Sequence, residues 1–357
     1  MSIRDISLAF LASLSLGVLL TPLARMGALK LRLMDRPAGR KKHLISTPLL
    51  GGLAIYVAFA ATVAGGMMLL NGEQGMIPMD WNSLGIMVIA AGGLMALVGL
   101  VDDILGLRPS LKLLLHTIAA VLAGVFFITR GALLSIFLTG SSLAWLAVPV
   151  TVIWLVGITN SVNLLDHADG LSAGTCAIAA IFFSIVNIIT GNYPVSFVSA
   201  ALAGATIGFF VYNYNPASIF MGDCGSNMLG FMLGIIAVLG VYTPEGSMRE
   251  IAIFTPILIL ALPMLDTAFV LRYRWKNDRP LFGADRNHLA HRLMRIGLTH
   301  NQSVRVLLAV ALLMGIPALL LPTLEPYQAV LVFVHALGLV VLFSFFMYRA
   351  ETTEVHR

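Results

Sequence analysis

The stretch LVGLVDDILGLRPSLKL, residues 97–113, places two adjacent aspartates at the end of a long apolar run. A carboxylate at the centre of a membrane costs about 2.5–3.5 kcal/mol to insert, and neighbouring carboxylates also repel each other. A run of this kind predicts a membrane-spanning helix that ends where the acids begin. Asp102 and Asp103 are therefore expected to face a polar cleft, where a cation offsets their charge.

The composition of the whole chain is typical of a membrane protein. Its 357 residues are 59% hydrophobic and only 11% charged, whereas soluble domains carry about 25% charged residues. No polar block is long enough for a second folded domain, so we expect one integral-membrane domain over residues 1–357. Cys176 and Cys224 are far apart and predict neither a disulfide nor a zinc ribbon.

Apolar runs of a length that crosses a bilayer recur along the chain. They predict an all-α, polytopic transmembrane bundle of about eleven helices. Their approximate limits are residues 6–24, 48–70, 83–101, 111–129, 143–161, 171–190, 195–212, 226–242, 251–271, 303–321 and 327–348.

The basic residues indicate which side each loop faces. With the N-terminus outside and the C-terminus in the cytoplasm, 19 of the 22 Lys and Arg residues lie in cytoplasmic segments. This positive-inside bias accounts for the net charge of +5 without a nucleic-acid partner. Two cytoplasmic loops, 160–170 and 213–225, contain no Lys or Arg and instead carry acid, Asn and Gly. They predict a site that faces the cytoplasm.

Two segments on the predicted cytoplasmic side, residues 97–113 and 160–174, carry carboxylates and amides. Acids at a helix C-terminus oppose the helix dipole, so structure alone does not favour Asp102 and Asp103. Adjacent carboxylates can bind a hard divalent cation or act as a base. In NSVNLLDHADGLSAG, residues 160–174, a spacing of three places polar groups on one helical face. These groups are Asn160, Asn163, Asp166 and Asp169, of which Asp169 could instead cap the following helix.

The segment YNYNPASIFMGDCGSNMLG, residues 212–230, places Asp223 between glycines. Gly222 and Gly225 would let the backbone approach a ligand closely, and the N–H groups of the next helix would suit a phosphate. The alternative is a tight turn before a helix that Ser226 caps. The segment is not a Walker A loop, because no G-K-[ST] follows.

Two basic segments lie on the same predicted side, DRPAGRKKHLISTPLLGG at 35–52 and GADRNHLAHRLMRIG at 283–297. Each either fixes orientation or binds an anion. Two histidines favour anion binding in the second segment, and the missing HExxH glutamate disfavours zinc. A divalent metal and phosphates at a membrane surface together indicate phosphoryl transfer involving a lipid phosphate. The basic residues concerned are Arg36, Arg40, Lys41, Lys42, His43, Arg286, His288, His291, Arg292 and Arg295.

An ion-coupled membrane transporter is the alternative from another class, since intramembrane acids also serve ion coupling. A transporter would predict acids near the middle of helices and a repeat that relates the two halves. The acids here cluster at one boundary, and we find no such repeat, so an enzyme is favoured.

The five segments, taken in their order along the chain from 35–52 to 283–297, resemble the polyprenyl-phosphate N-acetylhexosamine-1-phosphate transferases of glycosyltransferase family 4, from about residue 35 to 300. The resemblance implies that undecaprenyl phosphate attacks the β-phosphate of a UDP-sugar and releases UMP. It further implies a multi-pass protein of the bacterial inner membrane whose active site faces the cytoplasm. Such enzymes start envelope polymers such as lipopolysaccharide or teichoic acid. The resemblance leaves a homodimer open.

The resemblance also implies a role for each candidate residue. Asp223 matches the family's Mg²⁺ ligand, with Mn²⁺ as an alternative ion, and Asp102 and Asp103 match its catalytic acidic pair. Direct displacement and a covalent aspartyl intermediate both stay open. The substrate-binding positions are Asn163, Asp166, Asp169 and Asn213 on the nucleotide side, and Lys112, His288, His291 and Arg292 around the phosphates.

The chain departs from the family at two motifs. It reads DHADG at residues 166–170 where the family usually has D-G-x-D-G, and HLAH at residues 288–291 where the family usually has H-x-H-H. Both departures bear on sugar or nucleotide specificity more than on the reaction class. The short spacer between Asp103 and Lys112 favours the N-acetylglucosamine branch over the phospho-N-acetylmuramoyl-pentapeptide transferases of peptidoglycan synthesis.

Overall fold

The computed structural model describes residues 1–35, 46–70, 79–129, 146–242, 252, 254–280 and 287–352. These residues form helices and one short antiparallel ribbon, so the predicted all-α class is confirmed. The elements are α1 (Ile3–Leu31), β1 (Met34–Asp35), β2 (Thr47–Pro48), α2 (Gly51–Leu69), α3 (Trp81–Leu105), α4 (Pro109–Thr129), α5 (Ala147–Leu165), α6 (Leu171–Ile189), α7 (Tyr193–Asn213), α8 (Gly222–Leu239), α9 (Thr255–Ile259), α10 (Ala261–Lys276), α11 (Leu289–Arg295), α12 (His300–Leu320) and α13 (Pro326–Thr352).

Ten helices in the described residues are long and apolar enough to cross a membrane. The predicted run at 251–271 is not among them, so the expectation of one continuous helix there is wrong. The chain instead forms α9 and α10, which are separated at Leu260. Pro263 explains the break, because it has no N–H to donate to the carbonyl of Ile259 and its ring would clash with that carbonyl.

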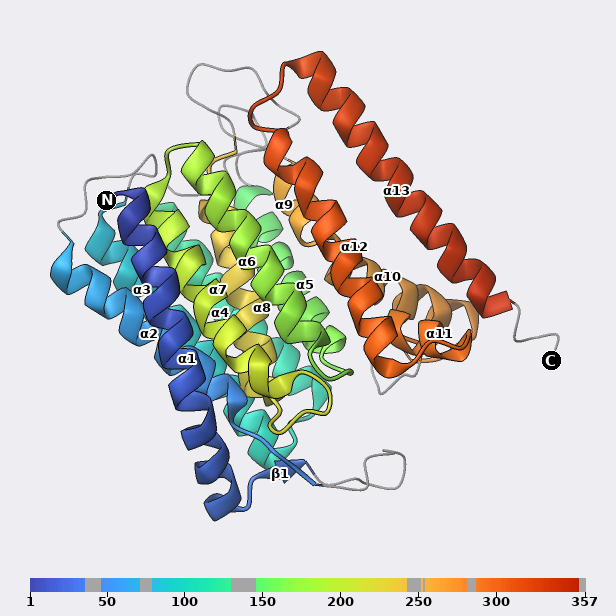
Figure 1. The fold of residues 1–357 in the computed structure, drawn as a ribbon, viewed down its shortest axis with the longest axis horizontal. Coiled ribbons are helices and arrows are strands. Elements are labelled where there is room, and N and C mark those ends of the chain that lie inside the picture. Colours follow the sequence, from blue (N-terminus) through green and yellow to red (C-terminus); the bar gives the residue numbers. More distant parts are fainter. Residues whose placement is uncertain are drawn as a thin grey trace.

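The centre of the bundle is formed by α6, α7 and α8. In the most apolar stretch of α8, 89% of the residues are buried inside the protein, whereas in that of α13 the share is 11%. Figure 1 shows α13 along the edge of the bundle, beyond α12. The outer helices α1, α4 and α13 expose many large apolar side chains, as expected for surfaces that face lipid.

Glycines allow two helices to pack directly against the start of α8. A Cβ on Gly99 of α3 would overlap the carbonyl oxygen of Asp223, and one on Gly52 of α2 would overlap the backbone of Gly225. The amide of Gly52 also donates to the carbonyl of Met221 at 3.0 Å. The first turn of α8 is therefore held between α2 and α3, which fixes the position of Asp223.

A second apolar cluster joins α10, α11, α12 and α13 to the loop between α5 and α6. Leu165 and Ala168 of that loop region pack in this cluster with Leu289, Ala290 and Leu293 of α11. The packing brings the predicted histidine segment of residues 288–291 against the DHADG segment of residues 166–170, although 117 residues of chain lie between them.

Candidate active site

The adjacent aspartates lie in the last turn of α3, and Lys112 lies in the first turn of α4. Gly106 ends α3 in the left-handed conformation, with φ of 63°, and the chain turns back at once into α4. Oδ1 of Asp102 accepts a hydrogen bond from the amide of Leu107 at 2.8 Å, and its Oδ2 lies 2.9 Å from Nζ of Lys112. The tight turn thus pairs the first aspartate with the lysine.

Lys112 connects this turn to two other helices. Its Nζ lies 2.8 Å from Oδ2 of Asp223 in α8 and donates to Oδ1 of Asn163 in α5 at 3.0 Å. The amide of Asn163 donates in turn to Oδ1 of Asp223 at 2.6 Å and to the hydroxyl of Ser226 at 2.8 Å. We call Asp102, Lys112, Asn163, Asp223 and Ser226 the oxygen cluster. Four helices bring it together from segments that were distant in the sequence.

Asp103 faces the backbone instead of the oxygen cluster. Its Oδ1 accepts from the amide of Asp223 at 2.8 Å, and its Oδ2 accepts from the amide of Cys224 at 3.0 Å. Gly222, with φ of 68°, lies so close that a Cβ there would clash with the Asp103 carboxylate. Asp103 therefore caps the N-terminus of α8 from a different helix.

Asp166 follows the last turn of α5, and its carboxyl group is buried close to other acids. Burial, together with the nearby charges of Asp223, Asp103 and Asp169, raises the pKa of Asp166 to about 8. A carboxyl group that keeps its proton near neutral pH can give or take a proton during a reaction.

Asp169 and Asn213 connect two loops, for which the family resemblance implies a place on the nucleotide side. Oδ2 of Asp169 accepts from the side-chain amide of Asn215 and from the backbone amide of Ala217, each at 3.0 Å. Asn213 accepts from the amide of Gly170 at 3.1 Å and donates to the carbonyl of Ile219 at 3.0 Å. These contacts fix the shape of both loops, while the predicted contact with the nucleotide stays a prediction.

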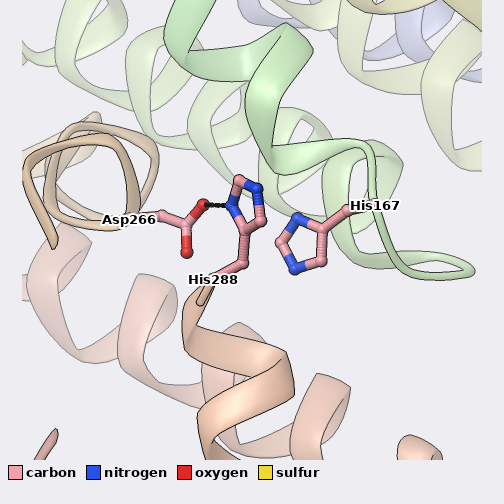
Figure 2. A group of neighbouring side chains, drawn as sticks. All are labelled: His167, Asp266 and His288. Atoms are coloured by element: carbon pink, nitrogen blue, oxygen red, sulfur yellow. Dashed lines mark hydrogen bonds and ion pairs between the residues drawn. The ribbon is translucent and has the colours of Figure 1, made fainter. Parts of the chain in front are cut away.

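Three histidines and an aspartate form a second group, the histidine cluster. It consists of His167, Asp266, His288 and His291. Nδ1 of His288 lies 2.7 Å from Oδ2 of Asp266, and the ring of His167 stacks on that of His288 at 4.1 Å between centroids (Figure 2). The ring of His291 is 5.2 Å from that of His167. His167 and Asp266 are functional candidates that the sequence motifs did not predict, although the departure from the family pattern at residue 167 was a signal for the first.

The two clusters differ in what they could hold. The oxygen cluster offers carboxylate, amide and hydroxyl oxygens around one cationic nitrogen, and hard oxygen donors are what Mg²⁺ prefers. Ligand atoms of His167, Asp266 and His288 lie within 4.8 Å of one another. The two rings are only 25° from parallel, so their lone pairs do not converge on a point. The donor atoms of the oxygen cluster therefore suit Mg²⁺ better than those of the histidine cluster.

Arg292 is buried and packs inside the protein. Its Nε donates to the carbonyl of Asn287 at 2.8 Å, and its guanidinium carbon lies 5.2 Å from the centre of the Phe269 ring. Its predicted contact with phosphate stays a prediction. The basic residues predicted at 36–43, and Arg286, lie outside the described residues.

Comparison with known proteins identifies the family. The model of glycosyl transferase family 4 matches residues 85–241. The chain is 34% identical, over 88% of its length and 85% of the relative's, to a probable undecaprenyl-phosphate N-acetylglucosaminyl 1-phosphate transferase of Bacillus subtilis. It is 31% identical, over 85% and 78%, to a decaprenyl-phosphate N-acetylglucosaminephosphotransferase of Mycolicibacterium smegmatis.

A phospho-N-acetylmuramoyl-pentapeptide-transferase of Clostridium botulinum is 34% identical but matches only 65% of the chain and 72% of its own length. The longer matches thus favour the N-acetylglucosamine type over the muramoyl-pentapeptide type. The resemblance inferred from the five motifs is confirmed, and the apolar helices agree with an integral, multi-pass membrane protein. The chain belongs to glycosyl transferase family 4, among the polyprenyl-phosphate N-acetylhexosamine-1-phosphate transferases.

Proposed function

We propose that the protein transfers a sugar 1-phosphate from a UDP-sugar to undecaprenyl phosphate. The sugar 1-phosphate that we favour is N-acetylglucosamine 1-phosphate. An oxygen of the lipid phosphate forms a bond to the β-phosphorus of the UDP-sugar. The bond from that phosphorus to the bridging oxygen breaks, and the bridging oxygen leaves with UMP. The reaction takes place at the cytoplasmic face of a bacterial inner membrane and starts an envelope polysaccharide.

The oxygen cluster is the observation that carries the proposal. Asp102, Asn163 and Asp223 direct oxygens at the Lys112 ammonium over 2.8–3.0 Å, so a cation already occupies the centre of the donor set. We assign Asp223 as the residue that would hold Mg²⁺, with Asp102 beside it. When bound there, Mg²⁺ supplies positive charge to the diphosphate as the leaving UMP becomes more negative.

We assign the remaining residues the roles that the family resemblance implies. Asp102 orients the lipid phosphate or accepts its proton, while Asp103 holds the backbone of α8 in place. Asn163, Asp166, Asp169 and Asn213 form the nucleotide side, as the family resemblance implies. Lys112, His288, His291 and Arg292 provide the positive charge that holds the phosphates.

The test uses purified protein in detergent with undecaprenyl phosphate, Mg²⁺ and one UDP-sugar at a time. The sugars are UDP-N-acetylglucosamine, UDP-N-acetylgalactosamine and UDP-N-acetylmuramoyl-pentapeptide, and UMP release is measured. We expect turnover with the first and none after EDTA. Asp223→Asn should abolish turnover while the protein stays folded, and Asp278→Asn, at an exposed acid, is the matched control. Turnover that survives Asp223→Asn would refute the metal assignment.

A further inference from the structure

Asp266 is the member of the histidine cluster that no motif explains. It lies on α10 and is completely buried. Both of its oxygens accept hydrogen bonds, Oδ1 from the amide of Leu289 and Oδ2 from Nδ1 of His288, each at 2.7 Å. A buried carboxylate needs such partners, because an unpaired one would cost several kcal/mol. Asp266 thus binds both the backbone and the side chain at the start of α11.

This contact decides which nitrogen of His288 carries a proton. A carboxylate accepts hydrogen bonds, so Nδ1 must donate, and the state of Nε2 is then free to respond to a ligand. Nδ1 of His288 is engaged by Asp266, so Nε2 is the second ring nitrogen, on the side of the ring away from that contact. Nε2 is therefore the atom of His288 that remains for an incoming group.

His167 holds the other side of the His288 ring. Its Nδ1 lies 3.1 Å from the carbonyl oxygen of Leu164, to which it must donate. Burial lowers the pKa of His167 to about 3, so the ring is neutral at physiological pH. A neutral ring can stack on His288 in either protonation state of the latter without charge repulsion.

The histidine cluster is continuous with the oxygen cluster through two consecutive residues. The side chain of His167 stacks on His288, while the carboxyl group of its neighbour Asp166 lies close enough to Asp223 for their charges to interact. The backbone amide of Asp166 also donates to the carbonyl of Asn163 in the oxygen cluster at 3.2 Å, so one short loop contacts both clusters, and a diphosphate held at Asp223 would lie beside that loop. Figure 2 shows Asp266 and His167 on opposite sides of His288.

We propose that Asp266 is a positioning residue that acts through His288. It keeps Nδ1 of His288 protonated, so that Nε2 faces a phosphate oxygen of the nucleotide-sugar diphosphate. His167 supports the His288 ring by stacking on it. The inference rests on the proposed function for the identity of the ligand. The Asp266–His288 relationship itself is a property of the free protein, so it can be tested without turnover.

The first experiment is nitrogen-15 NMR of protein labelled at histidine, with the His288 signals assigned by their loss in His288→Gln. The wild-type protein should show a protonated Nδ1 on His288. In Asp266→Asn the side-chain amide donates instead of accepting, so Nδ1 should lose its proton and Nε2 should gain one. An unprotonated Nδ1 in the wild type, or an unchanged tautomer in Asp266→Asn, would overturn the proposal. Asp278→Asn is the control and should leave the spectrum unchanged.

The second experiment measures kcat/KM for UMP release. Asp266→Asn should lower it by about 10–100-fold, the size of loss known for carboxylate partners of metal-bound histidines. Because Asp266 acts through His288, the Asp266→Asn/His288→Gln double variant should equal His288→Gln alone. Multiplied losses would overturn the positioning role. If the wild type releases no UMP from any sugar, the proposed function fails, and the NMR result still decides the Asp266–His288 relationship.

Discussion

Oδ1 of Asp103 lies 2.8 Å from the backbone nitrogen of Asp223, and Oδ2 of Asp103 lies 3.0 Å from that of Cys224. A carboxylate at the end of α3 thus caps α8 at the residue that we assign to the metal. The two adjacent aspartates have different tasks, because Asp102 pairs with Lys112 and Asp103 holds a backbone. In the acidic pair, Asp103 therefore positions the backbone of α8, and Asp102 is the residue available for chemistry.

This division predicts different outcomes at Asp103 and Asp223. Asp103→Ala removes a helix cap and should lower the free energy of unfolding by about 1–2 kcal/mol, together with loss of UMP release. Asp223→Asn leaves the cap in place and should lose activity with little change in stability. Thermal unfolding in detergent, alongside UMP release, measures both. An unfolding temperature that Asp103→Ala leaves unaltered would argue against the cap.

Lys112 should control how strongly Mg²⁺ stabilises the protein against unfolding. Lys112→Met leaves Asp102 and Asp223 without their shared cation, so the two carboxylates repel each other without compensation. Mg²⁺ should then raise the unfolding temperature of Lys112→Met by more than that of the wild type. Lys30→Met, at an exposed position, is the matched control. Equal responses to Mg²⁺ would place the metal away from these carboxylates.

Much of the fold was predictable because membrane helices obey simple local rules. Length and hydropathy located ten of the eleven predicted runs, since each must satisfy its backbone hydrogen bonds internally. The exception at 251–271 also has a local cause, the missing N–H of Pro263, which a count of apolar residues does not register.

The site was predictable only in part, because its contacts join distant segments. The pattern of acids and amides predicted one shared site for Asp102, Asn163 and Asp223, and the structure brings all three around Lys112. The cap formed by Asp103 could not be read from its own helix, since its partners are 120 residues away. Asp266 lies in an apolar stretch without a motif, so only the folded packing shows that it contacts His288.

Gly99 should be as important for activity as the charged residues, because it lets α3 approach the start of α8. A Cβ at this position would overlap the carbonyl oxygen of Asp223. Gly99→Ala should therefore destabilise the protein by about 1–3 kcal/mol and lower UMP release by displacing Asp223. Gly65→Ala, in open space on α2, is the control and should gain up to about 1 kcal/mol from helix propensity. Activity of Gly99→Ala equal to that of the control would contradict the close packing.

Asp166 should make stability depend on pH. Its pKa is about 8 in the folded protein and ordinarily 3.8, so the folded state holds a proton that the unfolded chain releases. The wild type should lose stability as pH rises from about 4 to about 8, by at most about 1.4 kcal/mol per pH unit. Asp166→Asn removes this loss.

The advantage of Asp166→Asn in unfolding temperature should therefore be small at about pH 4, grow to about pH 8 and stay constant above. Unfolding of both proteins across this range measures it, with Asp278→Asn as an exposed control that shows no such growth. A difference that is the same at every pH would mean that Asp166 is ionised in the folded protein throughout.

The two departures from the family pattern should be coupled. His167 replaces the usual glycine, and Ala290 replaces the usual histidine. Ala290 is buried in the same cluster as Leu165 and Ala168, which flank His167. Ala290→His alone should overpack this cluster and cost about 1–3 kcal/mol, and His167→Gly alone should remove the ring that stacks on His288. In the His167→Gly/Ala290→His double variant, removal of the His167 ring should give the new histidine room. The double variant should therefore recover stability and UMP release. A double-mutant cycle in unfolding free energy should show a favourable coupling of about 1 kcal/mol or more, and simple additivity would mean that the two departures are independent.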